Sequence, residues 1–278
     1  MTYDPIPNKS LGQHWLNDEV SLRNMLVAAD VQPEDTVLEI GPGLGSLTRL
    51  LTAAVAQVTA VEFDTILANN LARHVPAKNL RVVHSDILKF DLTTMPPDYK
   101  VVANIPYYLT SKLVRVLSES SNQPSQVALL VQKEVAERLA AGPGDLSILG
   151  VTAQYFWEIS LGEVVGAELF TPPPKVDSQI VIFKRRADPL FAEIDTKLFF
   201  RIVKAGFGAR RKTLLNSLGA GLHLDKTQAN SLLSESNIDP QLRAQNLTID
   251  QWYTLYSVYQ TQNYLQNNHR SHVLTNML

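Results

Sequence analysis

Short apolar runs alternate with segments of helical spacing through the first half of the chain, and this alternation constrains the fold more than any other feature. Five such runs end at turn-forming or polar residues. They are "TVLEI" (36–40), "QVTAVEF" (57–63), "LRVVHSD" (80–86), "YKVVANI" (99–105) and "QVALLVQ" (126–132). Helical patterns lie between and after them, from Ser46, through Leu71, and over residues 111–119 and 133–141. Strands that alternate with helices predict an α/β fold with a doubly wound, mostly parallel sheet.

Strand-like patterns continue to about residue 185, and helical patterns then replace them. Residues 148–159 and 178–185 are predicted as further strands, antiparallel at one edge of the sheet. The segment "RRADP" breaks the pattern, and only helical spacing follows, over residues 195–208, 211–222, 227–237 and 248–260. We therefore expect an α/β domain over residues 1–186 and a small helical domain over residues 187–278.

Cysteine is absent from all 278 residues, which excludes a disulfide framework and a cysteine-based zinc site. The six histidines show no ligand spacing, so we expect no bound metal. The N-terminal residues lack the basic segment and apolar core of a signal peptide, and no apolar run is long enough to span a bilayer. These features predict a cytoplasmic protein without a membrane partner, and a monomer is the default expectation.

Charge is distributed unevenly along the chain. The net charge is −2, but the residues from Lys184 onward carry 12 Lys/Arg and 7 Asp/Glu, against 13 Lys/Arg and 20 Asp/Glu before it. A basic C-terminal part beside an acidic N-terminal part indicates a polyanionic partner such as nucleic acid. A chance distribution of solvated surface charges is the alternative.

Three glycines, Gly41, Gly43 and Gly45, follow the first predicted strand in "LEIGPGLGSLT". Glycines at this place let the chain turn sharply and let a ligand approach the N-terminus of the next helix. Glu62 ends the second strand, where its carboxylate can accept hydrogen bonds from ribose hydroxyls. The spacing GxGxG is more typical of S-adenosylmethionine sites than the GxGxxG of nicotinamide dinucleotide sites. We therefore predict that Gly41, Gly43 and Glu62 bind S-adenosylmethionine, with a dinucleotide as the alternative.

Asp86 ends the third predicted strand in "VVHSDIL". A carboxylate there can accept a hydrogen bond from the adenine amino group of the cofactor. A helix N-cap or a turn is the alternative role for this residue. Because the carboxyl ends of parallel strands open into one crevice, the glycine loop, Glu62 and Asp86 are expected to line the same site.

The segment "NIPYY" ends the fourth predicted strand and opens into that crevice. An exocyclic adenine amine is a poor nucleophile because its lone pair is delocalised into the ring. Two acceptors that bind the amine hydrogens localise that lone pair. The Asn104 side-chain oxygen and the Ile105 carbonyl can supply them, with Pro106 restricting the conformation of Ile105. Tyr107 can stack on a flipped or single-stranded base, an interaction worth roughly 1–3 kcal/mol. A proline turn with both tyrosines packed on the core is the alternative.

Together these motifs resemble the RNA adenine-N6 methyltransferases of the ribosomal RNA adenine dimethylase superfamily. The resemblance rests on "LEIGPGLGSLT", "VEFD", "NIPYY", "KSLGQHWLND", "FTPPPKVDSQIV", "FGARRKTLLNSL" and "RAQNLTIDQW". It spans nearly the whole chain and is greatest to the bacterial small-subunit (16S) enzymes. It implies a Rossmann-like S-adenosylmethionine-dependent methyltransferase domain followed by a small helical domain. It also implies two methyl transfers to each of two adjacent adenines in a terminal hairpin loop of 16S rRNA, within the immature small ribosomal subunit.

The resemblance implies roles for individual residues. Carried over position by position, the cofactor-binding residues are His14, Leu16, Gly41, Glu62, Asp86 and Asn104. Leu16 would act through its backbone, Gly41 would lie at the methionine end, and Asn104 would lie at the reacting amine. Phe170, before "TPPP", would form a second wall for the flipped base opposite Tyr107, although it could equally be a core aromatic.

The segment "GARRK" is a basic patch at the start of a helix, and Arg210, Arg211 and Lys212 are predicted to contact RNA phosphates. A solvated helix face is the alternative.

Two departures from the family pattern stand out. Trp15 takes the place of the usual phenylalanine, and "DLSILGV" (145–151) replaces a longer segment that contains Lys, Tyr and Arg.

Two alternative functions remain for this chain. One is a resistance-type methylase of large-subunit rRNA, and the other is an assembly checkpoint that acts mainly by binding the immature small subunit.

Overall fold

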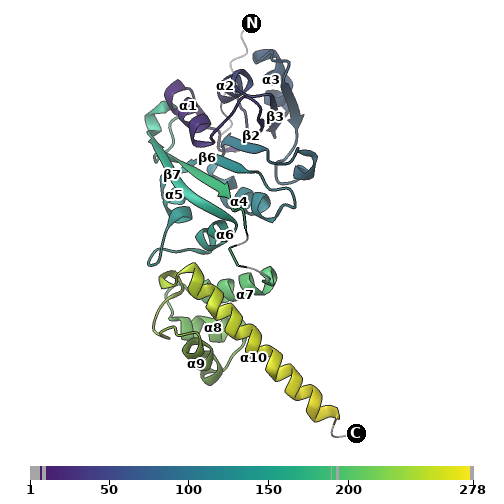
Figure 1. The fold of residues 1–278 in the computed structure, drawn as a ribbon. Helices are drawn as coiled ribbons and strands as arrows, with labels where there is room; N and C mark the ends of the chain where they lie inside the picture. The colour runs from purple at the N-terminus through teal and green to yellow at the C-terminus, as the bar shows by residue number, and fades with distance from the viewer. Residues whose placement is uncertain (1–6, 8–10, 189, 192–193, 276–278) are drawn as a thin grey trace. The chain divides into compact units, whose positions relative to one another are not determined.

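A seven-stranded mixed sheet forms the centre of the first of two compact units (Figure 1). The computed structural model describes residue 7 and residues 11–188, 190–191 and 194–275. The sheet contains β2 (Thr36–Ile40), β3 (Gln57–Glu62), β4 (Leu80–His84), β5 (Lys100–Asn104), β6 (Gln126–Gln132), β7 (Trp157–Val165) and β9 (Ser178–Arg185). Strands β2 to β6 pair in parallel, and β9 pairs antiparallel with both β6 and β7. The predicted doubly wound sheet with an antiparallel edge is confirmed.

The strand order is β4-β3-β2-β5-β6-β9-β7. The direction in which successive strands are added to the sheet reverses at β2. The chain adds β3 and β4 on one side of β2 and then returns to add β5 and β6 on the other side. Open α/β sheets bind ligands at such a reversal, outside the carboxyl ends of the strands. Because β2 ends at Ile40 and β5 ends at Asn104, the glycine loop and "NIPYY" both begin at this point.

Helices and short strands complete the first unit. The helices are α1 (Glu19–Ala28), α2 (Ser46–Ala54), α3 (Thr65–His74), α4 (Thr110–Glu119) and α5 (Lys133–Ala140). A separate antiparallel sheet consists of two short strands of two residues each, β1 (Trp15–Leu16) and β8 (Phe170–Thr171). Single 3₁₀ turns are η2 (Leu92–Thr94), η3 (Tyr107–Leu109) and η4 (Ala167–Leu169).

Both faces of the sheet are buried, which is why its strands appear as continuous apolar runs rather than as alternating patterns. Successive residues of a strand point to opposite faces. On β6, Ala128 belongs to the core cluster that includes Met25 of α1, whereas Leu129 lies beside Leu117 of α4. Buried apolar residues therefore fix the register of the central strands and hold their carboxyl ends in place.

The strand prediction for residues 148–159 is wrong in its first part. Residues Ile148–Phe156 form helix α6, and β7 begins only at Trp157. Ser147 caps the helix, because its hydroxyl accepts a hydrogen bond from the backbone N–H of Gly150 at 3.1 Å. The segment is apolar on nearly every side, so its hydrophobic pattern has no period that separates a helix from a buried strand.

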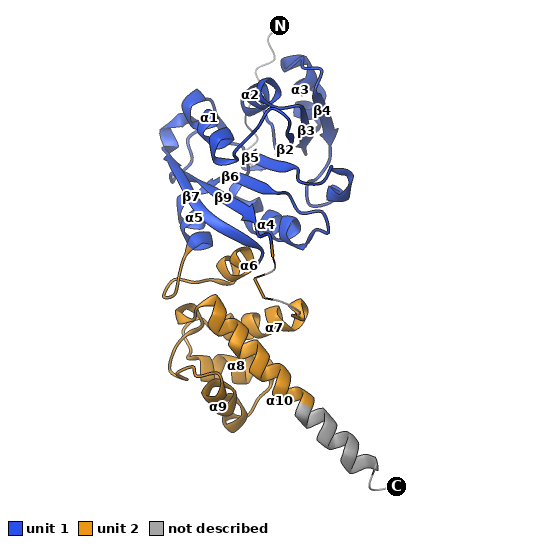
Figure 2. Ribbon diagram, in the orientation of Figure 1, with its two compact units in different colours: residues 1–140, 156–187 blue, residues 141–155, 188–278 orange. Residues whose placement is uncertain are grey.

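The second compact unit contains residues 141–155 and 188–278, and the first contains residues 1–140 and 156–187 (Figure 2). Besides α6, the second unit has α7 (Thr196–Phe207), α8 (Leu214–Leu222), α9 (Lys226–Glu235), η5 (Ala244–Asn246) and α10 (Ile249–Thr275). Gly144 and Gln245 exchange two hydrogen bonds of 2.8 Å, which attach the loop before α6 to this unit. The domain boundary expected from the sequence places that loop and α6 in the first domain instead.

Aromatic packing forms the core of the second unit. The rings of Phe207 and Trp252 stack with centroids 5.5 Å apart, and Gly206 lies so close to Trp252 that a side chain there would overlap the indole. Among the helices in the described part of the chain, none combines the length and the apolar character that crossing a bilayer requires.

Candidate active site

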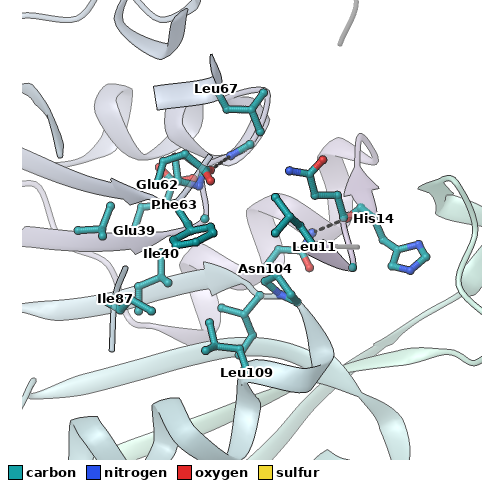
Figure 3. A pocket seen from close by; sticks show the side chains of 18 of the residues that line it. Leu11, His14, Glu39, Ile40, Glu62, Phe63, Leu67, Ile87, Asn104 and Leu109 are labelled. Carbon is teal, nitrogen blue, oxygen red and sulfur yellow. Dashed lines mark hydrogen bonds between the residues drawn. The ribbon is translucent and has the colours of Figure 1, made fainter. Parts of the chain in front are cut away.

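A cavity of about 310 Å³ opens at the reversal of strand order, outside the carboxyl ends of β2 and β5 (Figure 3). Ten of the residues predicted from the sequence line it, and they come from five separate chain segments. They are His14, Leu16, Gly41, Gly43, Glu62, Asp86, Asn104, Ile105, Pro106 and Tyr107. The fold therefore brings together the predicted cofactor-binding residues and the whole "NIPY" segment.

The glycine loop has a backbone conformation that side chains disfavour. Gly41, Gly43 and Gly45 have φ angles of +67°, +57° and +85°. A Cβ atom at Gly43 would lie 3.3 Å from the Trp15 ring, so the indole presses directly on the loop. Because no side chain caps the N-terminus of α2, the N–H groups of its first turn remain available to a ligand.

Glu62 is held in place by two backbone N–H groups. Its Oε2 accepts a hydrogen bond from Gly43 at 3.1 Å, and its Oε1 accepts one from Asp64 at 2.9 Å. Burial raises the pKa of this carboxyl, and the two hydrogen bonds oppose that rise. Each carboxylate oxygen has a second lone pair. Glu62 can therefore accept hydroxyl hydrogen bonds while its side chain stays fixed.

Glu39 is a second buried carboxyl in the cavity wall, and it was not among the residues predicted from the sequence. It is 1% exposed, and neither of its oxygens has a hydrogen-bond partner among the described residues. Burial raises the pKa of Glu39 to about 8, the nearby Thr48 hydroxyl opposes that rise, and the charge of Glu62 adds to it. The sequence signal for Glu39 is an acidic residue inside the apolar strand "TVLEI". Burying an unpaired carboxyl costs folding free energy, so an acid in such a strand indicates a function.

Around Asp86, the cavity combines one carboxylate with apolar walls. Asp86 Oδ1 accepts a hydrogen bond from the backbone N–H of Leu88 at 3.0 Å, as in the turn role considered for it. Phe63 and Ile87 flank the two acidic strand ends, and Figure 3 shows Phe63 and Glu62 on the side of the cavity opposite Asn104. A flat apolar ring with a polar edge would match this arrangement. No sequence motif assigned a role to Phe63, which follows Glu62 directly.

Asn104 has a fixed side-chain orientation. Its Nδ2 donates a hydrogen bond to the main-chain oxygen of His14 at 3.2 Å (Figure 3). A carbonyl can only accept, so the amide must place its nitrogen there and its oxygen on the other side. The oxygen is thus available as an acceptor at the end of β5, and Ile105 follows directly, 2% exposed.

Tyr107 is held from two directions. Its hydroxyl forms a 2.8 Å hydrogen bond with the hydroxyl of Ser178, which is fully buried at the start of β9. Its ring lies nearly parallel to that of His14, with centroids 5.9 Å apart and an interplanar angle of 19°. His14 is itself anchored, since its Nδ1 lies 2.7 Å from the carbonyl oxygen of Pro172. The "PPPKVDS" segment therefore supports both rings, a role that local sequence patterns do not reveal.

Phe170 does not reach the cavity. It is 3% exposed, belongs to the hydrophobic core cluster, and pairs with Leu16 in the β1–β8 ladder. The structure thus places it as a core aromatic, the second of the two roles considered for it. Arg210, Arg211 and Lys212 are exposed and belong to the second unit, so they do not line this cavity either.

The charge of the cavity suits a cationic ligand. Three carboxyl groups line it: Glu62 and Asp86 at the strand ends, and Glu39, which burial keeps protonated near neutral pH. Lys112 is the only lysine or arginine among its described lining residues. S-adenosylmethionine carries a sulfonium and an ammonium group against a single carboxylate. The unpaired oxygens of Glu39, the left-handed glycines and the apolar walls therefore fit this cofactor.

Comparison with known proteins gives the following matches. The family described as ribosomal RNA adenine dimethylase matches residues 7–261. A curated relative, ribosomal RNA small subunit methyltransferase A of Dehalococcoides mccartyi, is 41% identical over 259 residues, which cover 90% of this chain and 88% of the relative. The protein of the same name from Syntrophotalea carbinolica is 41% identical over 260 residues, covering 91% and 97%.

Two solved structures are similar over most of the chain. The 23S rRNA methyltransferase ErmE has a TM-score of 0.71 at 28% identity and covers 88% of this chain and 98% of its own. A dimethyladenosine transferase from Plasmodium falciparum has a TM-score of 0.71 at 25% identity, covering 87% and 96%.

Proposed function

The chain belongs to the ribosomal RNA adenine dimethylase family, and we propose that it methylates N6 of two adjacent adenosines in the 3′-terminal hairpin loop of 16S rRNA. S-adenosylmethionine is the methyl donor, and two transfers to each base give N6-dimethyladenosine. The two curated small-subunit enzymes named above are 41% identical to this chain, whereas the 23S rRNA enzyme is 28% identical. This difference favours the small-subunit substrate over the large-subunit alternative.

The fixed amide of Asn104 is the observation that carries the proposal. Its nitrogen is committed to the main-chain oxygen of His14, so its oxygen can accept one hydrogen of the substrate amine. The Ile105 carbonyl, directly after it, accepts the other. Two acceptors held in this way draw the amine towards a tetrahedral geometry and direct its lone pair at the methyl carbon.

The proton balance of the reaction requires no general base in the chain. S-adenosylmethionine, when bound, would supply the methyl group and leave as a neutral thioether, so the amine nitrogen would gain the methyl carbon as the carbon–sulfur bond breaks. The methylated nitrogen then carries a positive charge and loses a proton to water. The task of the protein is therefore to position the amine rather than to deprotonate it.

Tyr107 holds the target base in this proposal. Its hydroxyl is fixed by Ser178, so the ring has one orientation at the cavity, and a flipped adenine can stack on it. The aromatic partner found next to Tyr107 is the ring of His14, not that of Phe170.

The cofactor would lie along the strand ends, with roles divided by chemistry. Glu62 would accept hydrogen bonds from the ribose hydroxyls, and Asp86 one from the adenine amino group. Gly41 and Gly43 would allow close approach of the methionine end, and Leu16 would contribute its backbone. The exposed cations Arg210, Arg211 and Lys212 would contact rRNA phosphates from the second unit.

Biologically, we place the protein in the cytoplasm as a monomer that acts on immature small ribosomal subunits. The test is transfer of radiolabelled methyl groups from S-adenosylmethionine to small and large subunits isolated from cells that lack this gene. We expect label in 16S rRNA, recovered as N6-dimethyladenosine from the 3′-terminal hairpin. Label confined to 23S rRNA would contradict the proposal, and binding of small subunits without any transfer would favour the checkpoint alternative.

A further inference from the structure

A groove of about 610 Å³ lies in the second unit between α7 and α8, separate from the cavity described above. Its basic wall consists of Lys197, Arg201 and Lys204, and alanine, glycine and serine residues provide the rest of its lining. None of the described residues that line it is acidic. The groove is also distinct from Arg210, Arg211 and Lys212, the cations predicted from the sequence.

The three cations lie on one face of α7. Their spacing of four and three residues places them above one another on a helix, and Lys197 and Lys204 are separated by roughly 10 Å along the axis. All three side chains are exposed. Within the described part of the chain, none of the ion pairs involves them. Their charges are therefore free to interact with an anion.

Small residues make the groove open enough for a polymer. Gly221 of α8 packs so closely on α7 that a Cβ atom there would lie 2.6 Å from the Cβ of Ala205. The two helices meet at this point almost backbone to backbone, and Ala220 beside it is exposed. Among the described residues that line the groove, those other than the three cations and Ser217 are alanine or glycine.

We propose that this groove binds the phosphodiester backbone of RNA, in an inference that rests on the proposed rRNA substrate. The cations are spread along two helical turns rather than converging on one point, which matches successive phosphates better than a single small anion. Gly208 and Ala209 line the groove and precede Arg210 directly. The lining of the groove therefore ends directly before the basic segment Arg210–Lys212 in the chain.

The test measures the affinity of the full-length protein for a 16S rRNA transcript as a function of salt concentration. The groove variant carries Lys197→Gln, Arg201→Gln and Lys204→Gln. The matched control, Arg73→Gln, Lys78→Gln and Arg81→Gln, removes the same charge from exposed positions of the first unit that line neither cavity nor groove. We expect the groove variant to bind more weakly and its slope of log affinity against log salt to flatten by about 2, at about 0.7 per lost phosphate contact. The control should keep nearly the wild-type slope.

A second pair of variants tests the charge of the groove while all three cations stay in place. Ala220→Glu introduces a carboxylate into the groove, whereas Ala220→Gln introduces the same bulk without charge. We expect the glutamate variant to bind the transcript several-fold more weakly than the glutamine variant, with equal thermal unfolding temperatures.

Three measurements separate this inference from the proposed function. Affinity for S-adenosylmethionine should be the same in all variants, because the cofactor site lies in the first unit. A wild-type protein that methylates 16S rRNA, together with a groove variant that keeps the wild-type salt slope, would overturn the groove alone. A wild-type protein that methylates small subunits but does not bind the transcript would also overturn the groove alone, and one that does neither would overturn both proposals.

Discussion

The side-chain nitrogen of Asn104 donates a hydrogen bond to the main-chain oxygen of His14, across 90 positions of sequence. This contact orients the amide, because only its nitrogen can face a carbonyl. The N-terminal "GQHWL" segment therefore determines which amide atom of Asn104 in the "NIPY" segment faces away from that contact. The two motifs function as one unit of the site.

Replacing Asn104 by alanine should abolish most of the methyl transfer. Loss of one preorganised hydrogen-bond partner at a reacting group costs about 10²- to 10³-fold in kcat. Single-turnover transfer to 16S rRNA measures this effect, and calorimetric binding of the cofactor shows whether the cavity is intact. Asn70→Ala is the matched control, because the Asn70 amide also donates to a main-chain oxygen, that of Ile66, but outside the cavity. Near-normal turnover of Asn104→Ala would refute the role assigned to this amide.

Ser178→Ala and Tyr107→Phe should have the same effect on turnover, since each removes one partner of a single hydrogen bond. Both should lower kcat several-fold, and the double variant should be no worse than either single one. Additive losses would show that the two hydroxyls act independently. Tyr107→Ala should be more severe, about 5- to 150-fold, because it also removes roughly 1–3 kcal/mol of base stacking.

Glu39 should make the stability of the protein depend on pH. Its pKa is raised by burial from 4.5 to about 8, so the folded state holds a proton that the unfolded state releases. Stability from this group is therefore present below about pH 4.5 and is lost as the pH rises towards 8. Between pH 6 and 8 we expect the free energy of unfolding to fall by about 2 kcal/mol in the wild type but not in Glu39→Gln. Urea titrations at pH 6, 7 and 8 measure the difference, and parallel pH profiles would contradict it.

Gly43→Ala should weaken cofactor binding for two reasons. The left-handed conformation at φ +57° costs a residue with a side chain about 1–2 kcal/mol, and the new methyl group would press on Trp15 at 3.3 Å. Adding Trp15→Phe should restore part of the affinity, because it relieves the contact but not the strain. Gly142→Ala is the control, since a Cβ atom there meets nothing within 4 Å. Equilibrium binding of S-adenosylmethionine to the four proteins tests this prediction, and equal affinities would contradict it.

Local patterns in the sequence determined the architecture of the first unit and the chemistry of its strand ends. Apolar runs of strand length separated by helical spacing specify elements, and a parallel sheet brings the carboxyl ends of its strands into one crevice. Gly41, Glu62, Asp86 and Asn104 could be placed together because each follows a strand. The run at residues 148–156 forms a helix instead of the predicted strand, and because it is apolar on nearly every side its pattern has no period that separates the two.

Only the tertiary structure decided which side chains support the site and which do not. Ser178 lies 71 positions from Tyr107, and Pro172 lies 158 positions from His14, so no local pattern encodes either contact. Phe170 belongs to the core because β8 pairs with β1. The carboxyl oxygens of Glu39 lack hydrogen-bond partners among the described residues because of how the neighbouring segments pack. The basic groove likewise exists only because Gly221 lets α8 approach α7. Periodicity fixes the elements and their faces, whereas contacts between distant segments arise only when those elements pack.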